Sequence, residues 1–209
     1  MTRVIAGVVG GRRLAVPPGL ATRPTSDRAR EGLFGTVQAV LGSLTGARVL
    51  DLYAGSGAVG LEALSRGAAH ALLVESAPTA ISAIRANIAA LDLPGACLAA
   101  DRVERVLARG PTGARASCGA APGSADDGTR IRYHFVFADP PYAVGDGEVD
   151  AMLVALREGG WLADAALVTV ERRTGGAPLD WPCGYRTDRV RRYGDATLWY
   201  GLAAGGSAA

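Results

Sequence analysis

Residues 49–60 read VLDLYAGSGAVG, and this stretch decides the fold. Its first four residues are apolar except for Asp51, which indicates a short buried strand. Gly55, Gly57 and Gly60 follow, and glycines allow a backbone to turn sharply and to approach a ligand closely. The apolar residues after Gly57 begin a helix, whose first turn presents unpaired amide groups. The stretch therefore predicts a strand, a glycine loop and a helix in direct succession.

Strands and helices continue to alternate after this unit. The sequence predicts strands over 71–74, 96–100, 133–138 and 166–171, and helices over 57–66, 78–91, 102–109 and 149–156. Such alternation is typical of a parallel sheet with helices on both faces. Residues 185–193 and 196–202 read instead as two long strands joined at Gly194-Asp195, an antiparallel hairpin that closes the sheet. We therefore expect an α/β fold with a mostly parallel, seven-stranded sheet.

The N-terminal side predicts an extension to this domain. Residues 1–15 indicate a small β-hairpin around Gly10-Gly11, and residues 1–25 form an arginine-rich arm. Ser26 or Thr25 then caps a helix, so the main domain is expected over residues 26–202. Residues 110–129 are rich in glycine, alanine, proline and serine and predict a flexible insertion. Residues 203–209 are expected to be a disordered tail.

Charge is unevenly distributed along the 209 residues, although the net charge is only +2. Residues 1–35 carry +4 and residues 172–192 carry +4, whereas residues 36–171 carry −5. The two basic ends are either separate solvated surfaces or, if they flank one cleft, an electrostatic footprint for a phosphate backbone.

Several features bear on the location of the protein. No apolar run approaches the roughly 20 residues of a membrane helix, and the N-terminus lacks the apolar region of a signal peptide. Cys97, Cys118 and Cys183 lie far apart, match no metal-ligand spacing and predict no disulfide framework. We expect a cytoplasmic protein with no metal and no membrane contact.

The glycine loop predicts an adenosine-containing cofactor. Its Gly-x-Gly-x-x-Gly spacing fits NAD or S-adenosylmethionine, and Glu75, twenty residues after Gly55, suits the ribose hydroxyls of either. Asp51 favours S-adenosylmethionine, because a carboxylate there opposes a pyrophosphate but attracts the ammonium group of a methionine moiety. Tyr53 and Ser56, within the loop, are assigned to the same site.

Asp101 ends the third predicted strand and is a candidate acceptor for the adenine amino group, with Arg102 beside it. The alternative is that Asp101 is the N-cap of the helix over 102–109. Glu62, inside the helix after the glycine loop, is expected to be a surface residue rather than a ligand.

Residues 139–142 read DPPY, a pattern suited to methylation of an exocyclic amine. The lone pair of such an amine is delocalised into its ring, and two acceptors aimed at its hydrogens free that pair for attack. Asp139 supplies a carboxylate and Pro140 a carbonyl, which consecutive prolines hold rigidly before the substrate arrives. Pro141 completes that rigid pair, and Tyr142 offers a face on which an extruded base stacks.

The position of DPPY distinguishes it from an ordinary proline turn. The motif directly follows the apolar strand over 133–138, and the glycine loop follows another strand. In a doubly wound sheet these two strands are expected to be neighbours where the strand order reverses, at the ligand-binding edge. This arrangement places the amine beside the methyl donor.

With these motifs the chain resembles the Rossmann-like class I amino-methyltransferases, and specifically the bacterial RsmD family. The resemblance rests on RVIAG at 3–7, TRPTSDRAREGLF at 22–34, DLYAGSG at 51–57 and DPPY at 139–142. It implies S-adenosylmethionine as cofactor and N2 of a guanine in 16S ribosomal RNA as target, with an assembling 30S particle as partner and a monomeric enzyme. It also implies that the N-terminal segment binds RNA; the candidate residues are Arg3, Arg12, Arg13, Arg23, Thr25 and Arg28.

Other functions remain open from the sequence. DPPY also serves N6 of adenine in DNA, although residues 143–209 complete the sheet and leave little chain to read a DNA sequence. Protein glutamine methylation fits an arginine-rich arm poorly. An NAD-dependent oxidoreductase agrees with the glycine spacing but lacks a hydride-transfer site, and a non-catalytic RNA-binding protein leaves DPPY unexplained. For the helical arginines, ion pairs to Asp27 or Glu31 are an alternative to RNA contacts.

Overall fold

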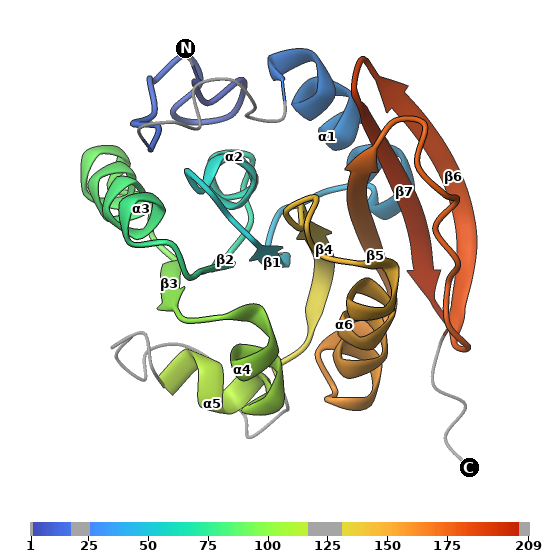
Figure 1. Ribbon diagram of the computed structural model, residues 1–209. Coiled ribbons are helices and arrows are strands. Elements are labelled where there is room, and N and C mark those ends of the chain that lie inside the picture. The colour runs from blue at the N-terminus through green and yellow to red at the C-terminus, as the bar shows by residue number, and fades with distance from the viewer. Residues whose placement is uncertain (1, 18–25, 117–130, 205–209) are drawn as a thin grey trace.

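A seven-stranded sheet runs through the protein in the order β3-β2-β1-β4-β5-β7-β6 (Figure 1). The computed structural model describes residues 2–17, 26–116 and 131–204. The strands are β1 Arg48–Leu52, β2 His70–Glu75, β3 Ala96–Ala100, β4 Tyr133–Ala138, β5 Leu162–Arg173, β6 Tyr185–Tyr193 and β7 Ala196–Ala203. The helices are α1 Asp27–Leu41, α2 Ala58–Ser65, α3 Pro78–Leu91, α4 Val103–Ala108, α5 Gly110–Ala116 and α6 Asp146–Glu158.

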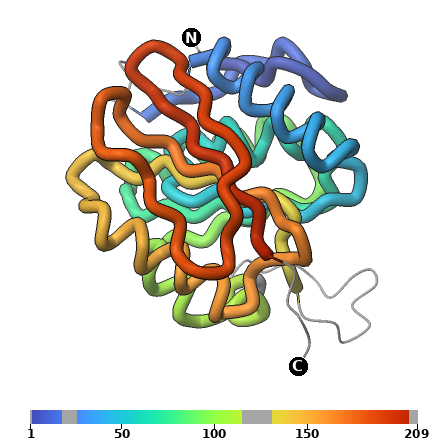
Figure 2. Tube along the Cα trace, turned by 90° about the vertical axis from the view of Figure 1, so that its right-hand side faces the viewer, coloured from blue at the N-terminus to red at the C-terminus, as the bar shows by residue number. Residues whose placement is uncertain are grey.

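Strand direction follows the predicted pattern. Strands β1 to β5 pair in parallel, β7 is antiparallel to β5, and β6 is antiparallel to β7. The parallel part consists of strands joined by helices, and the last two strands form a hairpin at the edge of the sheet (Figure 2). The predicted α/β fold with a mostly parallel seven-stranded sheet is confirmed.

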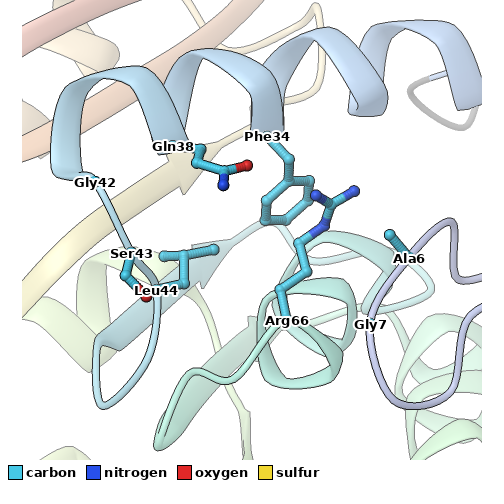
Figure 3. Close-up of a pocket in the computed structure, with 8 residues that line it drawn as sticks. All are labelled: Ala6, Gly7, Phe34, Gln38, Gly42, Ser43, Leu44 and Arg66. Carbon is cyan, nitrogen blue, oxygen red and sulfur yellow. The ribbon is translucent and has the colours of Figure 1, made fainter.

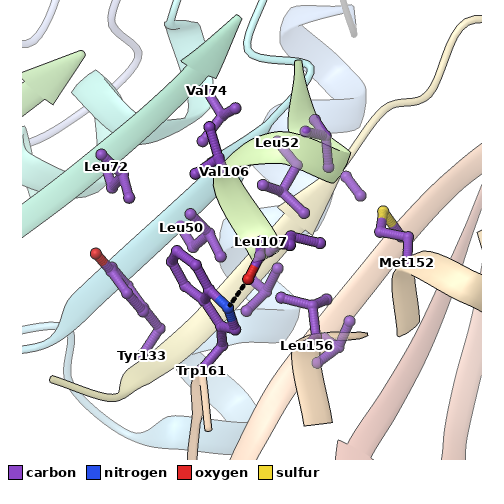
Figure 4. Close-up of a cluster of buried hydrophobic side chains, with 14 of the residues drawn as sticks. Leu50, Leu52, Leu72, Val74, Val106, Leu107, Tyr133, Met152, Leu156 and Trp161 are labelled. Carbon is purple, nitrogen blue, oxygen red and sulfur yellow. Dashed lines mark hydrogen bonds between the residues drawn. The ribbon is translucent and has the colours of Figure 1, made fainter. Parts of the chain in front are cut away.

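Side chains alternate between two faces of the sheet, because successive residues of a strand point in opposite directions. In β1, Val49 belongs to a core cluster with α1, α2 and α3, whereas Leu50 belongs to a cluster with α4, α5 and α6. In the second cluster Trp161 is fully buried and its Nε1 donates to the Leu107 carbonyl at 3.2 Å (Figure 4). Two apolar layers therefore hold the helices on both faces.

The N-terminal arm, residues 2–17, reverses direction as predicted but forms only one antiparallel bridge, between Arg3 and Arg13. Two regular strands do not form, because the backbone amides at the tip bond elsewhere. The amide of Val8 donates to the Ser65 carbonyl at 2.8 Å, and that of Val9 donates to Ser65 Oγ at 3.1 Å. The end of α2 therefore takes the place of a paired strand.

Glu62 of α2 fixes this arm, and the expectation that Glu62 is a surface residue was wrong. Its side chain is fully buried and accepts hydrogen bonds from the amides of Ile5 and Ala6 at 2.5 and 2.9 Å. Its Oε1 also pairs with Arg66 at 2.8 Å. Arg66 in turn lies over the Phe34 ring, 4.6 Å from its centroid, in a small pocket between α1 and the arm (Figure 3).

Other differences from the predictions concern segments with weak local signals. The proposed flexible insertion at 110–129 begins with helix α5, so the prediction was wrong for residues 110–116, and residues 117–129 lie outside the described residues. Ala114 is buried in the core, which explains why this short helix packs. Strand β7 includes Ala203, and the predicted tail beyond Ala204 is not among the described residues.

Two observations concern cysteine chemistry and membranes. Cys97 is disulfide-bonded, so the expectation of no disulfide was wrong, whereas Cys183 is free and exposed.

Within the described ranges, the helices are all too short or too polar to cross a membrane.

We predict that Glu62→Ala lowers the free energy of unfolding by about 2 kcal/mol or more, because two amides and the Arg66 guanidinium lose a buried acceptor. Urea unfolding measures this change. Glu31→Ala is the matched control, since Glu31 is exposed on α1, and its effect is expected to stay within about 0.5 kcal/mol. Equal stability of the two variants would show that Glu62 does not hold the arm.

Candidate active site at the carboxyl edge of the sheet

The register of the parallel strands brings the predicted site residues to one edge. Leu52, the last residue of β1, pairs with Ala138 on one side and Val74 on the other. Glu75 of β2 pairs with Ala100 of β3. The residues that follow these strand ends therefore meet at the carboxyl edge, where the strand order reverses between β1 and β4 and ligands bind in such sheets.

The glycine loop requires its glycines for backbone conformation. Gly55 has φ of 57° and Gly57 has φ of 76°, in the left-handed region that side chains disfavour. Gly57 is also the N-cap of α2, and its amide donates to the Ala54 carbonyl at 2.7 Å. A Cβ on Gly55 would meet no heavy atom within 4 Å, so space beside the loop is open to a ligand.

Glu75 holds the loop in place from the end of β2. Its Oε2 accepts from the Gly55 amide at 2.9 Å, and its Oε1 accepts from the amides of Ser76 and Ala77 at 2.7 and 2.8 Å. A carboxylate has about four lone-pair sites, so these three bonds leave room for a further donor. The structure thus places Glu75 beside the loop, and its contact with ribose hydroxyls stays a prediction.

Asp51 lies beneath the loop and is only 1% exposed. Its Oδ2 accepts from the Gly60 amide in the first turn of α2 at 2.8 Å. Burial raises the pKa of Asp51 to about 8, the bond from Gly60 opposes that rise, and the Glu75 carboxylate adds to it. Position 60 requires glycine, because a Cβ there would lie 2.3 Å from the Leu73 side chain.

Tyr53 directly follows β1 and has φ of 58°, an uncommon value for a bulky residue. Burial, and after it the carboxylates of Glu104 and Glu148, raises the pKa of its hydroxyl to about 12. Such backbone strain occurs at functional sites when the surrounding structure holds it in place. Because Tyr53 precedes the glycine loop and lies near Glu104 of α4 and Glu148 of α6, it is placed between the loop and these two helices.

Ser56 is buried, and its contact reveals a residue that sequence reasoning missed. Asn87 Nδ2 donates to the carbonyls of Ser56 and Ala15 at 2.9 and 3.0 Å, and Asn87 Oδ1 accepts from the Ala15 amide at 2.7 Å. Asn87 thereby ties the glycine loop to the arm. The available signal was an amide side chain on the apolar face of α3, where it shares burial with Ile84 and Leu91.

The DPPY motif leaves β4 next to the glycine loop. The Asp139 amide donates to the Leu52 carbonyl at 3.3 Å, which continues the pairing of β4 with β1 by one residue. Pro140 is buried, Pro141 is exposed, and Tyr142 is 43% exposed. The two motifs, predicted to be neighbours, are brought together.

Arg172, a second missed residue, holds the chain after the motif. It extends from the end of β5, donating to the Val144 carbonyl at 3.0 Å and to Asp146 at 2.8 Å. The Val144 amide closes a turn onto the Pro141 carbonyl at 2.8 Å. The signal in the sequence was an arginine at the end of an apolar strand. This clamp restricts the loop that carries the DPPY side chains.

Asp101 follows β3 at the same edge but is not the N-cap of α4, which is Arg102. Its Oδ1 accepts from the Arg102 amide at 2.8 Å, and its carboxylate pairs with Arg109 and, at 3.7 Å, with Arg105. The bond from the Arg102 amide, and then the Arg109 guanidinium, hold the pKa of Asp101 below its usual value. An ionised acceptor therefore lies near the end of β3.

The predicted RNA-binding arginines divide into bonded and exposed residues. Arg3 pairs with Asp27 at 3.4 Å, and Arg12 donates to the Ala90 carbonyl at 2.9 Å. Arg13 and Arg28 are exposed. Arg23 and Thr25 lie outside the described residues. Arg30, which was not a candidate, is fully buried and pairs with Asp27 at 2.7 Å.

Comparison with known proteins agrees with this architecture. The family model described as "Conserved hypothetical protein 95" matches residues 2–118 and 120–201. Ribosomal RNA small subunit methyltransferase D of Escherichia coli (strain K12) is 36% identical over 169 residues, which cover 81% of this chain and 73% of the relative. YlbH of Bacillus subtilis (strain 168) is 31% identical over 173 residues, 81% of each chain.

Solved structures show the same fold over nearly the whole chain. That of yhhF from Escherichia coli has a TM-score of 0.76 at 31% identity and covers 97% of this chain and 98% of its own. A protein from Thermus thermophilus has a TM-score of 0.71 at 30% identity, with 96% and 98% covered. The family model spans both the glycine loop and DPPY, and the chain therefore belongs to the RsmD family of methyltransferases.

Proposed function

We propose that this protein transfers a methyl group from S-adenosylmethionine to the exocyclic N2 amino group of a guanine in small-subunit ribosomal RNA. The observation that carries the proposal is the bond from the Asp139 amide to the Leu52 carbonyl, which fixes DPPY beside the glycine loop. The name of the Escherichia coli relative supports the ribosomal substrate. The choice of guanine N2 follows the family resemblance.

The residues at the carboxyl edge fit S-adenosylmethionine. Open space beside Gly55 suits the close approach of a ligand, and the Asp51 carboxyl beneath the loop suits a cationic amino group better than a pyrophosphate. Glu75 and Asp101 provide acceptors for ribose hydroxyls and for an adenine amino group. The bound cofactor supplies an activated methyl group.

Asp139, Pro140 and Tyr142 act on the substrate amine. The Asp139 carboxylate and the Pro140 carbonyl accept the two amine hydrogens, which directs the nitrogen lone pair toward the methyl carbon. The exposed ring of Tyr142 stacks on the extruded base. Asp139 need not be a strong base, because the nitrogen loses its proton only after it carries the methyl group.

Arg172 contributes to this chemistry indirectly, because it holds the loop that follows DPPY. Its bonds to Val144 and Asp146 hold the acceptors in position before substrate arrives, which lowers the cost of reorganisation in the transition state. We further propose a monomeric, cytoplasmic enzyme that acts on an assembling 30S particle. The arm over 1–25 then contributes to RNA binding, and the domain over 26–202 carries out methyl transfer.

Asp139→Ala is expected to reduce methyl transfer to 16S ribosomal RNA by about 100-fold or more, because the amine loses a positioned acceptor. Transfer of labelled methyl groups measures the rate, mass spectrometry of the nucleosides identifies the methylated base, and calorimetry checks that cofactor affinity is retained. Asp150→Ala is the matched control, since Asp150 is exposed on α6. Full activity of the Asp139 variant would refute its assignment.

Binding of S-adenosylmethionine is expected to tighten between about pH 6 and 7.5, by up to about tenfold per pH unit. With a pKa of about 8, Asp51 is largely protonated in the free protein below that pH, whereas a bound ammonium group favours the ionised carboxylate. Asn at position 51 keeps an acceptor for the Gly60 amide but does not titrate. Calorimetry should therefore show weaker, nearly pH-independent binding for Asp51→Asn, and an identical pH profile in both proteins would exclude Asp51 as the titrating group.

A further inference from the structure

Strand β6 is at the edge of the sheet and carries four arginines. Within the described residues its only strand partner is β7. The four are Arg186, Arg189, Arg191 and Arg192. Charged residues on an edge strand discourage pairing with other chains. They do so whichever face of the strand they occupy. If the arginines gather on one face, protection of the edge alone does not explain them, and a binding role is indicated.

Three of these arginines share one face. Arg186 pairs with Leu202, Arg189 with Tyr200 and Arg191 with Leu198, and directly paired residues of antiparallel strands lie on the same face. The register shift between Thr187 and Arg189 keeps Arg186 in phase with the other two. This face is the one against which α1 packs, because Leu198 and Tyr200 belong to the same core cluster as Leu33 and Phe34 of α1.

Arg192 lies on the opposite face. It pairs with Thr197, one residue along β7 from Leu198, and successive residues of a strand point in opposite directions. Like Arg191, Arg192 is exposed. Arg191 and Arg192 therefore carry the same charge on the same strand but lie on opposite faces of the sheet.

Helix α1 adds a fourth arginine to the same surface. A Cβ on Gly32 would lie 2.0 Å from Tyr193 Oη, so the end of β6 packs directly against α1 at this glycine. Arg28 precedes Gly32 by four residues and lies on the same side of the helix. Figures 1 and 2 both show the end of β6 beside the first turns of α1. We call Arg28, Arg186, Arg189 and Arg191 the β6 basic face.

Most of the charge of the β6 basic face is not neutralised by neighbouring carboxylates. Arg189 pairs with Asp188, whereas Arg28, Arg186 and Arg191 are exposed and have no ion pair with an acid of the described segments. Asp27, next to Arg28, instead pairs with Arg3 and Arg30. Three guanidinium groups are thus available to an anionic partner.

The surface also reaches the edge that carries DPPY. Ala138, which precedes Asp139, pairs with Val170, and Glu171 lies across β7 from Arg191 through Leu198. Arg191 is therefore one residue further toward the carboxyl edge than the row of Ala138. The positive surface therefore begins level with the edge that carries DPPY, three strands from β4, and continues away from that edge along β6.

We propose that the β6 basic face binds the phosphate backbone of the RNA strand that leads to the target base, an inference that rests on the proposed function. Guanidinium groups bind phosphate oxygens with strong charge-assisted hydrogen bonds. The hairpin thereby adds a second RNA-binding surface to the one proposed for the N-terminal arm.

Binding of a full-length 16S ribosomal RNA transcript across a salt titration tests this inference. The double variant Arg186→Gln/Arg191→Gln is expected to bind several-fold more weakly, and the slope of log K against log salt concentration should become shallower by about 1.5, since roughly 0.7–0.9 is lost per phosphate contact. Arg85→Gln/Arg192→Gln removes the same charge from α3 and from the opposite face of β6, and its affinity and slope should match the unchanged protein.

The outcomes separate this inference from the proposed function. Equal slopes for both double variants, with an unchanged protein that binds and methylates the transcript, would overturn the β6 basic face alone. An unchanged protein that binds S-adenosylmethionine in calorimetry but methylates neither the transcript nor an assembling 30S particle would contradict the proposed substrate instead. Calorimetry on both variants should give unchanged cofactor affinity, which shows that these exposed substitutions leave the fold intact.

Discussion

The bond from the Asp139 amide to the Leu52 carbonyl joins the ends of β4 and β1, strands whose sequences are far apart. Because parallel strands align their carboxyl ends, this register places Asp139, the proposed acceptor for the substrate amine, beside the glycine loop. A shift of one residue in the pairing of β4 with β1 would turn every side chain of β4 to the other face of the sheet. The side chains of DPPY would then no longer face the glycine loop. The packed layers on both faces make such a slip costly, so the core determines the geometry of the site.

Polar side chains around the loop hold it in place on the side that is proposed to bind the cofactor. Asp51, Glu75 and Asn87 each bond to backbone groups of the loop or its flanks, so the loop keeps its shape without a ligand. Such preorganisation reduces the free energy spent on ordering when a cofactor binds. Asn87 and Glu62 also hold the N-terminal arm against α3 and α2. Arm, loop and sheet edge are therefore linked to one another through these hydrogen bonds.

The sequence predicted the elements whose signals are local. The order of strands and helices, the glycine loop and DPPY each depend on neighbouring residues, and the structure brings them together as expected. Glu62 and Asn87 escaped prediction because their partners lie 56 or more residues away in the arm, and only the folded chain shows that these polar side chains are satisfied. Arg172 escaped for the same reason, since its partner Asp146 lies 26 residues away. Helix α5 has a glycine-rich sequence, and burial of Ala114 overrides that weak propensity.

The structure of the protein bound to S-adenosylmethionine would test the central claim most directly. We predict that the adenosine lies along the loop at Gly55 and Gly57, that the methionine ammonium faces Asp51, and that the methyl group points toward the Asp139 carboxylate. A cofactor bound away from this edge, for example in the pocket beside Phe34, would contradict it. A methyl group directed away from Asp139 would do so as well, because no amine held by DPPY could then reach it.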